Sequence, residues 1–258
     1  MPELPDLEVF ARNLQRELKG KKLNGIKLSR EASTKTNQKE LEAALTGSTL
    51  HSVYREGKEL RLQFSNDNIL GVHLMLRGKF FWFEDKNTHR DTLLELIFSG
   101  GKNLALTDYQ HRATIKLNPE ESTVPDALSK KADEKYLESI LSSRATIKNL
   151  LLDQHVIRGI GNAYADEILW DAGISPFSIA NKIPAAGAKA LAKSIKKVLE
   201  HAVKQIDTAE KGIIGGEIRD FLQVHNASKA KTASGAGIVK KTVGGRPTYY
   251  TEEQELYK

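Results

Sequence analysis

The first apolar positions of the chain recur with the period of a helix. They are Leu4, Leu7, Phe10, Leu14 and Leu18, spaced three or four residues apart. Such spacing places them on one face of an α-helix. Pro5 suits the first turn of this helix, and Gly20 can end it. The amino terminus is therefore predicted to lie at the head of a helix.

The pattern changes between residues 23 and 117, where apolar residues fall in short alternating or continuous runs. The runs cover residues 60–64, 80–83, 93–98 and 104–106. Runs of this length are typical of β-strands, and Gly100 and Gly101 form a turn signal between two of them. We predict a β-rich sandwich or barrel that is capped by the first helix.

Helical patterning returns after a polar stretch at residues 119–133, which contains prolines and charges as linkers do. Helices are predicted over residues 134–141, 147–154, 162–172 and 185–206. In the last of these, Leu191, Ile195, Val198 and Ala202 line one face. The second half of the chain is therefore predicted to be a helical domain.

The end of the chain has a third sequence pattern. Residues 225–238 are rich in Ala, Ser, Lys and Gly and indicate a mobile loop. Residues 238–243 and 246–250 flank two glycines, which predicts a hairpin. The fold class is thus α+β with two domains. Its parts are a β-sandwich at 1–118, a linker at 119–133, a helical domain at 134–224, and a loop with a hairpin at 225–258.

The composition gives the chain a net positive charge and excludes cysteine chemistry. Lys and Arg outnumber Asp and Glu by 39 to 33, a formal charge of +6, which suits a polyanionic partner but is shared by many other proteins. The chain has no cysteine, which excludes disulfides, thiolate zinc sites and cysteine nucleophiles. It has no apolar run of membrane length and no secretion signal, because acids occur early, at Glu3 and Asp6. We expect a soluble intracellular protein.

Proline at position 2 offers unusual chemistry once Met1 is removed. The product is a secondary amine beside Glu3. Such an amine condenses with a sugar carbon at the aldehyde level to give an iminium, which is an electron sink. A Met-Pro start is also common in proteins where it only begins a helix. Pro2 alone leaves both interpretations open.

Residues 2–8, Pro-Glu-Leu-Pro-Asp-Leu-Glu, resemble the opening of the formamidopyrimidine-DNA glycosylase and endonuclease VIII family, which usually reads Pro-Glu-Leu-Pro-Glu-Val-Glu. The resemblance implies that the nitrogen of Pro2 attacks the sugar C1′ of a damaged nucleotide and that Glu3 is the general acid on the sugar ring. A carboxyl that burial keeps protonated can do this. Asp6 replaces a glutamate and would help to organise the pocket.

Two further motifs resemble this family. Residues 55–60 are similar to its β-hairpin lysine, which implies that Lys58 acts near the lesion and its phosphate. Residues 73–78, His-Leu-Met-Leu-Arg-Gly, are similar to the segment whose methionine fills the gap left by the extruded nucleotide. Leu76 occupies that wedge position, and an apolar wedge offsets part of the cost of unstacking. Leu76 would fit equally well as a core residue of a strand.

The next motif departs from the family pattern. Relatives commonly read Asp-Pro-Arg-Arg-Phe-Gly, whereas residues 108–113 are Asp-Tyr-Gln-His-Arg-Ala. Gln110 would face the orphaned base, and Arg112 would stand where the family has an aromatic wedge. The preference for a particular opposite base is therefore left open.

Residues 147–176 give the longest match, to the family's helix-two-turn-helix with its Gly-x-Gly-Asn turn. Glycines let the backbone approach a phosphate, and the start of a helix presents free amides to an anion. The resemblance makes Lys148 and Asn162 phosphate contacts. It also makes Glu167 a residue that supports the active site.

Residues 245–250 resemble the arginine and strand of the family's zinc finger, with Arg246 gripping the phosphates beside the lesion. The missing cysteines match the zincless-finger branch. Residues 215–221, with Arg219 in a supporting role, resemble the segment before the lesion-capping loop, which would be residues 225–238. Between Asp220 and Glu252 the charged residues are all basic: Lys229, Lys231, Lys240, Lys241 and Arg246. We expect this segment to meet a phosphate backbone, although a basic tail is often only solvated.

Together the motifs imply a bifunctional DNA glycosylase and AP lyase of base excision repair. It would be a monomer that acts on damaged double-stranded DNA, with neither a metal such as zinc nor an organic cofactor. It would extrude the base, form a Schiff base through Pro2 and cut the strand by elimination. Its expected location is the cytoplasm of a bacterium or the nucleus of a eukaryote.

Two alternatives belong to other classes. One is a catalytically silent relative that binds damaged DNA; Gln110 and Arg112 favour it, whereas the retained Pro2, Glu3 and Lys58 oppose it. The other is a basic RNA-binding protein, which would leave the Met-Pro-Glu start unexplained. The lesion stays open among formamidopyrimidines, 8-oxoguanine, oxidised pyrimidines and hydantoins.

Overall fold

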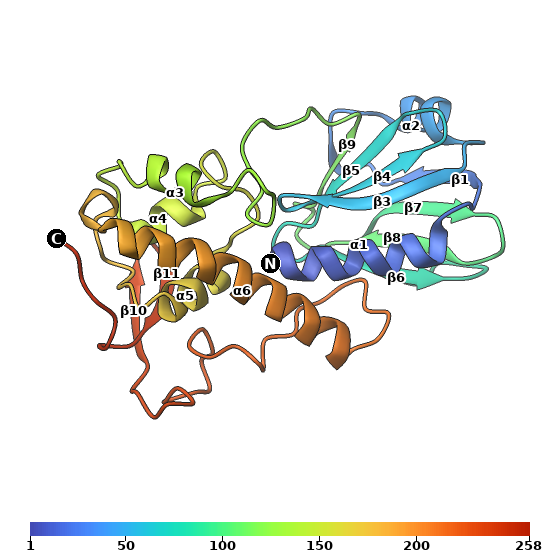
Figure 1. The fold of residues 1–258 in the computed structure, drawn as a ribbon. Coiled ribbons are helices and arrows are strands. Elements are labelled where there is room, and N and C mark those ends of the chain that lie inside the picture. Colours follow the sequence, from blue (N-terminus) through green and yellow to red (C-terminus); the bar gives the residue numbers. More distant parts are fainter. The chain divides into compact units, whose positions relative to one another are not determined.

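The computed structural model describes residues 1–258, which form two compact units. Unit 1 comprises residues 1–121 and 206–217, and unit 2 comprises residues 122–205 and 218–258. Figure 1 shows strands in unit 1 and mainly helices in unit 2, which confirms the α+β class with two domains. None of the helices has both the length and the apolar character that crossing a bilayer requires.

Unit 1 contains the first two helices and nine strands. They are α1 (Leu4–Leu18), β1 (Leu23–Leu28), β2 (Ser33–Thr34), α2 (Gln38–Leu45), β3 (Leu50–Glu56), β4 (Glu59–Phe64), β5 (Ile69–His73), β6 (Lys79–Phe83), β7 (Thr92–Phe98), β8 (Asn103–Thr107) and β9 (Thr114–Leu117). One sheet has the order β1-β7-β8-β6, and the other has the order β2-β9-β5-β4-β3. All neighbours are antiparallel except β2 and β9. Helix α2 lies in a region for which the sequence predicts only strands.

The core of unit 1 lies between these layers. The five apolar residues that predict the first helix are all buried, and α1 packs against β3. The strands contribute alternating apolar residues, among them Leu62 and Phe64 from β4 and Leu94 and Leu96 from β7. Each such side chain contributes about 1.5–3 kcal/mol through its removal from water. This burial holds the head of α1 in a fixed place on the sheet.

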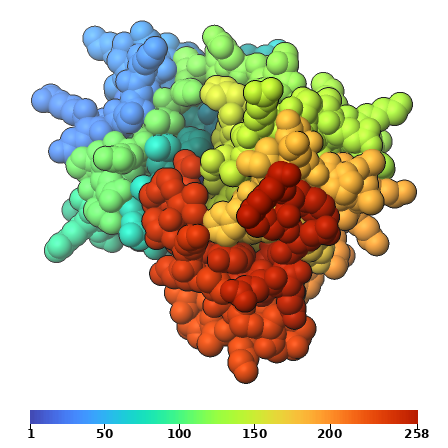
Figure 2. Space-filling model, turned by 90° about the vertical axis from the view of Figure 1, so that its left-hand side faces the viewer, coloured from blue at the N-terminus to red at the C-terminus, as the bar shows by residue number.

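Unit 2 contains the remaining elements. They are α3 (Glu134–Ile140), α4 (Ile147–Leu152), α5 (Asn162–Asp171), the 3-10 helix η1 (Ala180–Lys182), α6 (Ala185–Ala209, which runs on into unit 1), β10 (Val239–Val243) and β11 (Arg246–Tyr250). All four predicted helices are confirmed to within three residues. The predicted hairpin is also confirmed, with Val239 opposite Tyr250 and Val243 opposite Arg246. Figure 2 shows the last part of the chain, coloured orange to dark red, at the surface.

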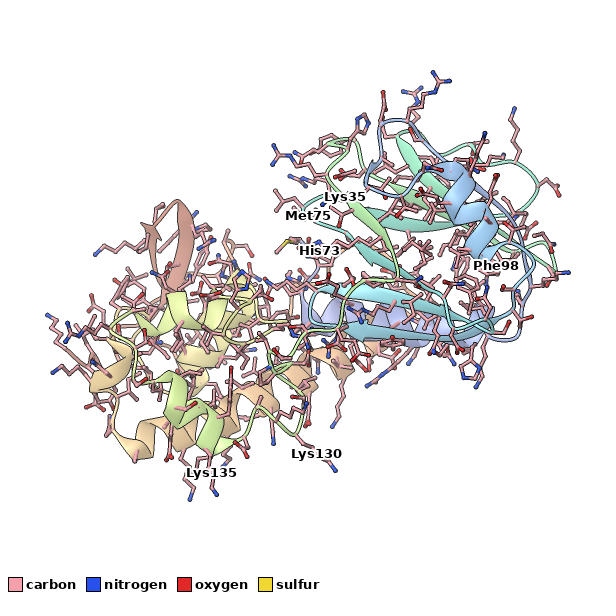
Figure 3. The ribbon with its side chains drawn as sticks, turned by 90° about the horizontal axis from the view of Figure 1, so that it is seen from above. Lys35, His73, Met75, Phe98, Lys130 and Lys135 are labelled. Carbon is pink, nitrogen blue, oxygen red and sulfur yellow. The ribbon has the colours of Figure 1, made fainter.

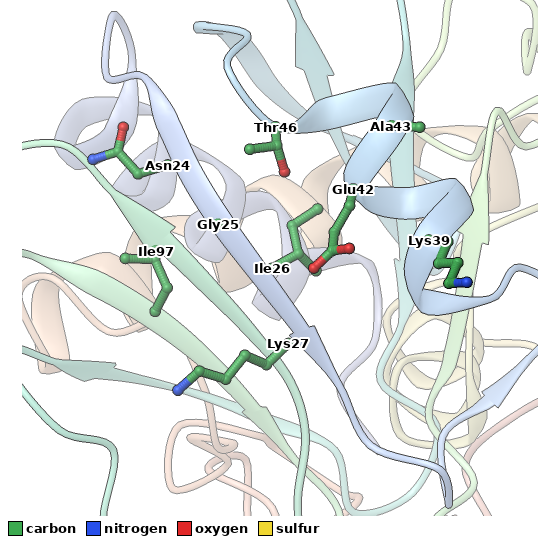
Figure 4. Close-up of a pocket in the computed structure, with 9 residues that line it drawn as sticks. All are labelled: Asn24, Gly25, Ile26, Lys27, Lys39, Glu42, Ala43, Thr46 and Ile97. Carbon is green, nitrogen blue, oxygen red and sulfur yellow. The ribbon is translucent and has the colours of Figure 1, made fainter.

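Unit 1 also has a hollow between β1 and α2 (Figure 4). Its charged side chains are Lys27, Lys39 and Glu42, beside the apolar Ile26 and Ile97. None of these residues belongs to a motif identified in the sequence. The hollow therefore lies apart from the candidate functional site.

Candidate functional site

Buried carboxylates surround the amino terminus at the head of α1. Pro2 is buried, Glu3 is 4% exposed and Asp6 is fully buried. The backbone nitrogen of Glu3 donates a hydrogen bond to Oδ2 of Asp6 at 2.8 Å. A side chain at this position satisfies a backbone donor at the helix start. Asp6 therefore fixes the backbone beside Pro2, even though it is shorter than the glutamate it replaces.

The head of α1 and the β3–β4 turn lie at the same end of the sheet. The backbone nitrogen of Val53 donates to Oε1 of Gln15 at 2.5 Å, and Nε of Arg55 pairs with Oε2 of Glu8 at 3.2 Å. The helix numbers fall as the strand numbers rise, so α1 and β3 run antiparallel. The head of α1 therefore lies at the end of β3, where the next turn carries Lys58.

His73 lies beside this turn, at the end of β5. Strands β4 and β5 are antiparallel, so the start of β4 adjoins the end of β5. Burial, together with the positive charges of Lys58 and Lys116, lowers the pKa of His73 to about 4. His73 is therefore a neutral imidazole, and its Nδ1 accepts a hydrogen bond from the backbone nitrogen of Met75 at 3.0 Å. Figure 3 shows the two residues next to each other.

Two loops adjoin each other beyond His73, because His73 pairs with Thr114 at the start of β9. The first loop exposes Leu76 and the second exposes Tyr109, with exposed fractions of 50% and 59%. Arg77 joins them, since its Cζ lies 6.0 Å from the centroid of the Tyr109 ring. The exposure of Leu76 excludes the alternative that it is a core residue. The two loops thus present a pair of apolar side chains to solvent.

The second loop is held by one buried carboxylate. Asp108 accepts hydrogen bonds from the backbone nitrogens of Gln110, Arg112 and Ala113 at 2.8–2.9 Å. The side chains of Gln110 and Arg112 are exposed next to Tyr109. Sequence reasoning did not select Tyr109. An aromatic residue directly after a turn aspartate was the available signal.

Unit 2 contains a buried charge cluster at the base of the hairpin. Nζ of Lys148 lies 2.7 Å from Oδ1 of Asp166 and donates to Oγ1 of Thr248 at 2.8 Å. Oδ2 of Asp166 accepts from the backbone nitrogen of Tyr249 at 2.9 Å and lies 2.7 Å from Nδ1 of His225. Asp166 therefore ties α4, the hairpin and the start of the 225–238 loop to α5. Sequence reasoning missed Asp166 and His225, since single polar residues at these positions look solvated.

Asn162 adds a further tie to the hairpin. Its Nδ2 donates to the carbonyl oxygen of Pro247 at 2.8 Å, directly after the exposed Arg246. Thus Lys148 and Asn162 both contact the hairpin, and Arg246 stands at its turn. Residues 239–250 contain no Cys, His, Asp or Glu, so they offer a zinc ion no ligand. No group of three or more His, Cys, Asp or Glu side chains elsewhere could hold a metal ion.

Glu167 anchors the segment that leads into residues 225–238. Its carboxylate accepts hydrogen bonds from the backbone nitrogens of Gln223, Val224 and His225 at 2.7–2.8 Å. Burial raises the pKa of Glu167, and these hydrogen bonds oppose that rise. In the same unit, the guanidinium of Arg219 lies 5.3 Å from the ring centroid of Tyr164. Glu167 therefore fixes the backbone at the start of the loop, and Arg219 lies against α5.

Glu217 belongs to unit 1 and was not selected from the sequence. Its Oε1 forms an ion pair with the terminal ammonium of Met1. The two residues are 216 positions apart, so no local pattern could have indicated the contact. It places a third carboxylate near the amino terminus, beside Glu3 and Asp6.

Comparisons with known proteins find relatives that cover nearly the whole chain. Residues 1–115 match the model of the formamidopyrimidine-DNA glycosylase N-terminal domain, and residues 124–212 match that of the formamidopyrimidine-DNA glycosylase H2TH domain. The chain is 30% identical to the formamidopyrimidine-DNA glycosylase of Streptococcus mutans, with 97% of both chains covered. It is 32% identical to that of Syntrophomonas wolfei, covering 98% of this chain and 99% of the relative.

Solved structures give the same result. A complex of Lactococcus lactis Fpg with DNA that contains an abasic site superposes with a TM-score of 0.86, at 28% identity, covering 98% of this chain and 100% of the other. A complex of MutM with DNA that contains carbocyclic 8-oxo-G gives a TM-score of 0.85 at 29% identity, covering 97% and 98%. The similarity thus includes both units and the hairpin.

Proposed function

This chain belongs to the formamidopyrimidine-DNA glycosylase family, and from that premise we propose that it excises damaged bases through an imine on Pro2 and then cuts the strand. Membership makes it a DNA glycosylase of base excision repair, and the absence of cysteine fits the zincless-finger branch. The observation that carries the finer proposal is Pro2 itself, buried at the head of α1 directly before Glu3, whose backbone nitrogen Asp6 holds.

The proposed reaction begins once Met1 has been removed. The neutral amine of Pro2 attacks C1′, and the bond to the base breaks so that its electron pair leaves with the base. Glu3 gives a proton to the ring oxygen as the ring opens, and loss of the N–H proton leaves an iminium. The iminium acidifies C2′, so loss of a proton there expels the 3′ phosphate. The position of the buried Glu3 directly after Pro2 supports this acid role.

Lys58 is proposed to contact the phosphate beside the lesion. Its charge is close enough to His73 to lower the pKa of that imidazole. The β3–β4 turn also places Lys58 at the end of the sheet where α1 begins. A positive charge at this point would hold an anionic backbone near the amine of Pro2.

The two exposed apolar side chains are proposed to fill the gap left by the extruded nucleotide. Leu76 would enter the stack from one loop and Tyr109 from the other. Apolar wedges offset part of the cost of unstacking, and an aromatic ring also stacks on a base. Gln110 and Arg112 flank Tyr109, and we propose that they face the base opposite the lesion.

The hairpin is proposed to grip the phosphates through Arg246. Lys148 and Asn162 would stabilise the position of Arg246 through their hydrogen bonds to Thr248 and Pro247, which follow Arg246 directly. Glu167 and Arg219 would support the capping loop at residues 225–238. The partner is damaged double-stranded DNA, which the similar Lactococcus lactis protein binds in its crystal structures.

Borohydride trapping tests the proposal. The purified protein is mixed with duplexes that carry an abasic site, 8-oxoguanine, a formamidopyrimidine, an oxidised pyrimidine or a hydantoin. We expect a covalent adduct, because borohydride reduces the imine to a stable amine. The variant Pro2→Thr should give much less adduct, since threonine at position 2 still allows Met1 to be removed but replaces the more nucleophilic secondary amine by a primary amine.

The control is Arg246→Ala, which should weaken DNA binding but still form the adduct at saturating protein. Mass spectrometry of each protein should show that Met1 is absent. If the wild-type protein, without Met1, forms no adduct on any duplex yet binds them, it is the silent DNA-binding relative instead.

A further inference from the structure

We propose that Glu217 is the general base that removes a proton from the nitrogen of Pro2. This inference rests on the proposed function and adds a catalytic residue to it. In the structure the carboxylate of Glu217 pairs with the terminal ammonium of Met1. Three covalent bonds separate that nitrogen from the nitrogen of Pro2. Removal of Met1 transfers the terminal ammonium to Pro2, within reach of a rotation of the Glu217 side chain.

The backbone before Glu217 is fixed against unit 1. Nδ2 of Asn13, on the buried side of α1, donates to the carbonyl oxygen of Ile213 at 2.8 Å. Gly215 touches β6 so closely that an added Cβ would lie 2.9 Å from the carbonyl oxygen of Phe80. Gly216 has φ +95°, a left-handed conformation that favours glycine. These contacts fix residues 213–216 against α1 and β6, and Glu217 follows at the amino terminus.

The carboxylates near the amino terminus differ in their surroundings. Glu3 and Asp6 are buried, and Asp6 is committed to the backbone of Glu3. Glu217 is exposed, with 35% of its side chain accessible. An exposed carboxylate can pass a proton on to water. Glu217 is thus suited to be the base, whereas the buried Glu3 is suited to be the acid.

The step balances as a proton transfer followed by bond formation. An N–H bond of the Pro2 ammonium breaks, its electron pair stays on nitrogen, and the proton moves to Oε1 of Glu217. The lone pair then forms the bond to C1′, and the bond to the leaving base breaks. The ion pair that Glu217 forms with the terminal ammonium of Met1 shows the same two kinds of group in contact.

The test is single-turnover imine formation on an abasic duplex, trapped with borohydride between pH 5.5 and 9. The wild-type rate should be nearly flat around neutral pH, because Glu217 rather than the solvent removes the proton. In Glu217→Gln the rate at pH 7 should fall by about 10²–10⁴-fold, the range for loss of a general base. Its rate should then rise with pH, because solvent must now remove the proton.

Matched variants separate chemistry from structure. Glu217→Asp keeps a carboxylate and should keep the flat profile at a reduced rate. Glu210→Gln removes an exposed carboxylate from the same segment and should behave as the wild type. If Glu217→Gln lowers the rate equally at every pH, or leaves it unchanged, Glu217 is not the base. If the wild-type protein gives no adduct at all, the Pro2 chemistry fails first, which is a distinct outcome.

Discussion

The buried imidazole of His73 makes the stability of the folded protein depend on pH. Its neutral Nδ1 accepts the backbone hydrogen bond that shapes the loop carrying Leu76. The pKa of His73 is about 4 in the folded protein against 6.5 for an ordinary histidine. At a pH between these two values, His73 binds a proton in the unfolded chain but not in the folded chain. The stability that His73 provides is therefore complete above pH 6.5 and is lost as the pH falls towards 4.

This predicts that His73→Asn flattens the acid side of the stability curve. At pH 5 the unfavourable pKa of His73 costs the wild type at most about 2 kcal/mol of unfolding free energy. The variant avoids that loss, so the difference between the two proteins should shrink or reverse between pH 7 and pH 5. Urea unfolding at several pH values measures this. A variant of the exposed His51 is the control, and parallel curves for wild type and His73→Asn would contradict the prediction.

A second prediction for a single residue concerns Tyr109. Replacement by alanine should reduce base excision about ten-fold on intact lesions, because the gap in the stack is then filled by Leu76 alone. Cutting at abasic sites should change much less, since no base has to be extruded. Tyr109→Phe keeps the ring and should retain most of the activity. Excision and abasic cutting by Tyr109→Ala that fall by the same factor would argue that the ring only stabilises the loop.

At the scale of elements, the hairpin depends on one carboxylate of α5. Asp166→Asn keeps the shape of the side chain but leaves the Lys148 ammonium buried without its counter-charge. Loss of one partner of a buried pair costs about 3–5 kcal/mol. We expect the hairpin to detach, with faster hydrogen exchange at the amide of Tyr249 and weaker DNA binding.

The matched control removes both charges of that pair. Asp166→Leu combined with Lys148→Met replaces the buried ion pair by apolar side chains of similar size, which is often nearly neutral. The double variant should therefore be more stable than Asp166→Asn, although the bond to Tyr249 is lost in it. Unchanged hydrogen exchange at Tyr249 in Asp166→Asn would show that strand pairing alone holds the hairpin.

Elements differ in how well the sequence predicts them. Helix α1 and the long α6 follow from their apolar spacing, because one face of each is buried continuously. Helix α2 was not predicted from its apolar spacing, because it buries only Leu41 and Leu45. The feature that indicates this helix is a polar capping motif, in which the side chain of Asn37 accepts a hydrogen bond from the backbone nitrogen of Glu40. A search for caps would have found it among the strands.

At the scale of the whole molecule, the motifs predicted the family and the candidate residues, because each motif is contiguous in sequence. What they could not predict is which distant residues meet. Glu217 reaches the amino terminus across 216 positions, and Asp166 reaches Tyr249 across 83. Such contacts depend on the packing of the chain within each unit, for which a local pattern carries no information.

The way in which the hairpin is anchored has a consequence for the conditions this enzyme can tolerate. Thiolate ligands are lost to peroxide and to chelators, whereas the ties from Lys148, Asn162 and Asp166 contain only nitrogen and oxygen. The oxidants that create damaged bases therefore have no sulfur to attack in this chain apart from two methionines. The hairpin would therefore stay assembled under oxidative stress.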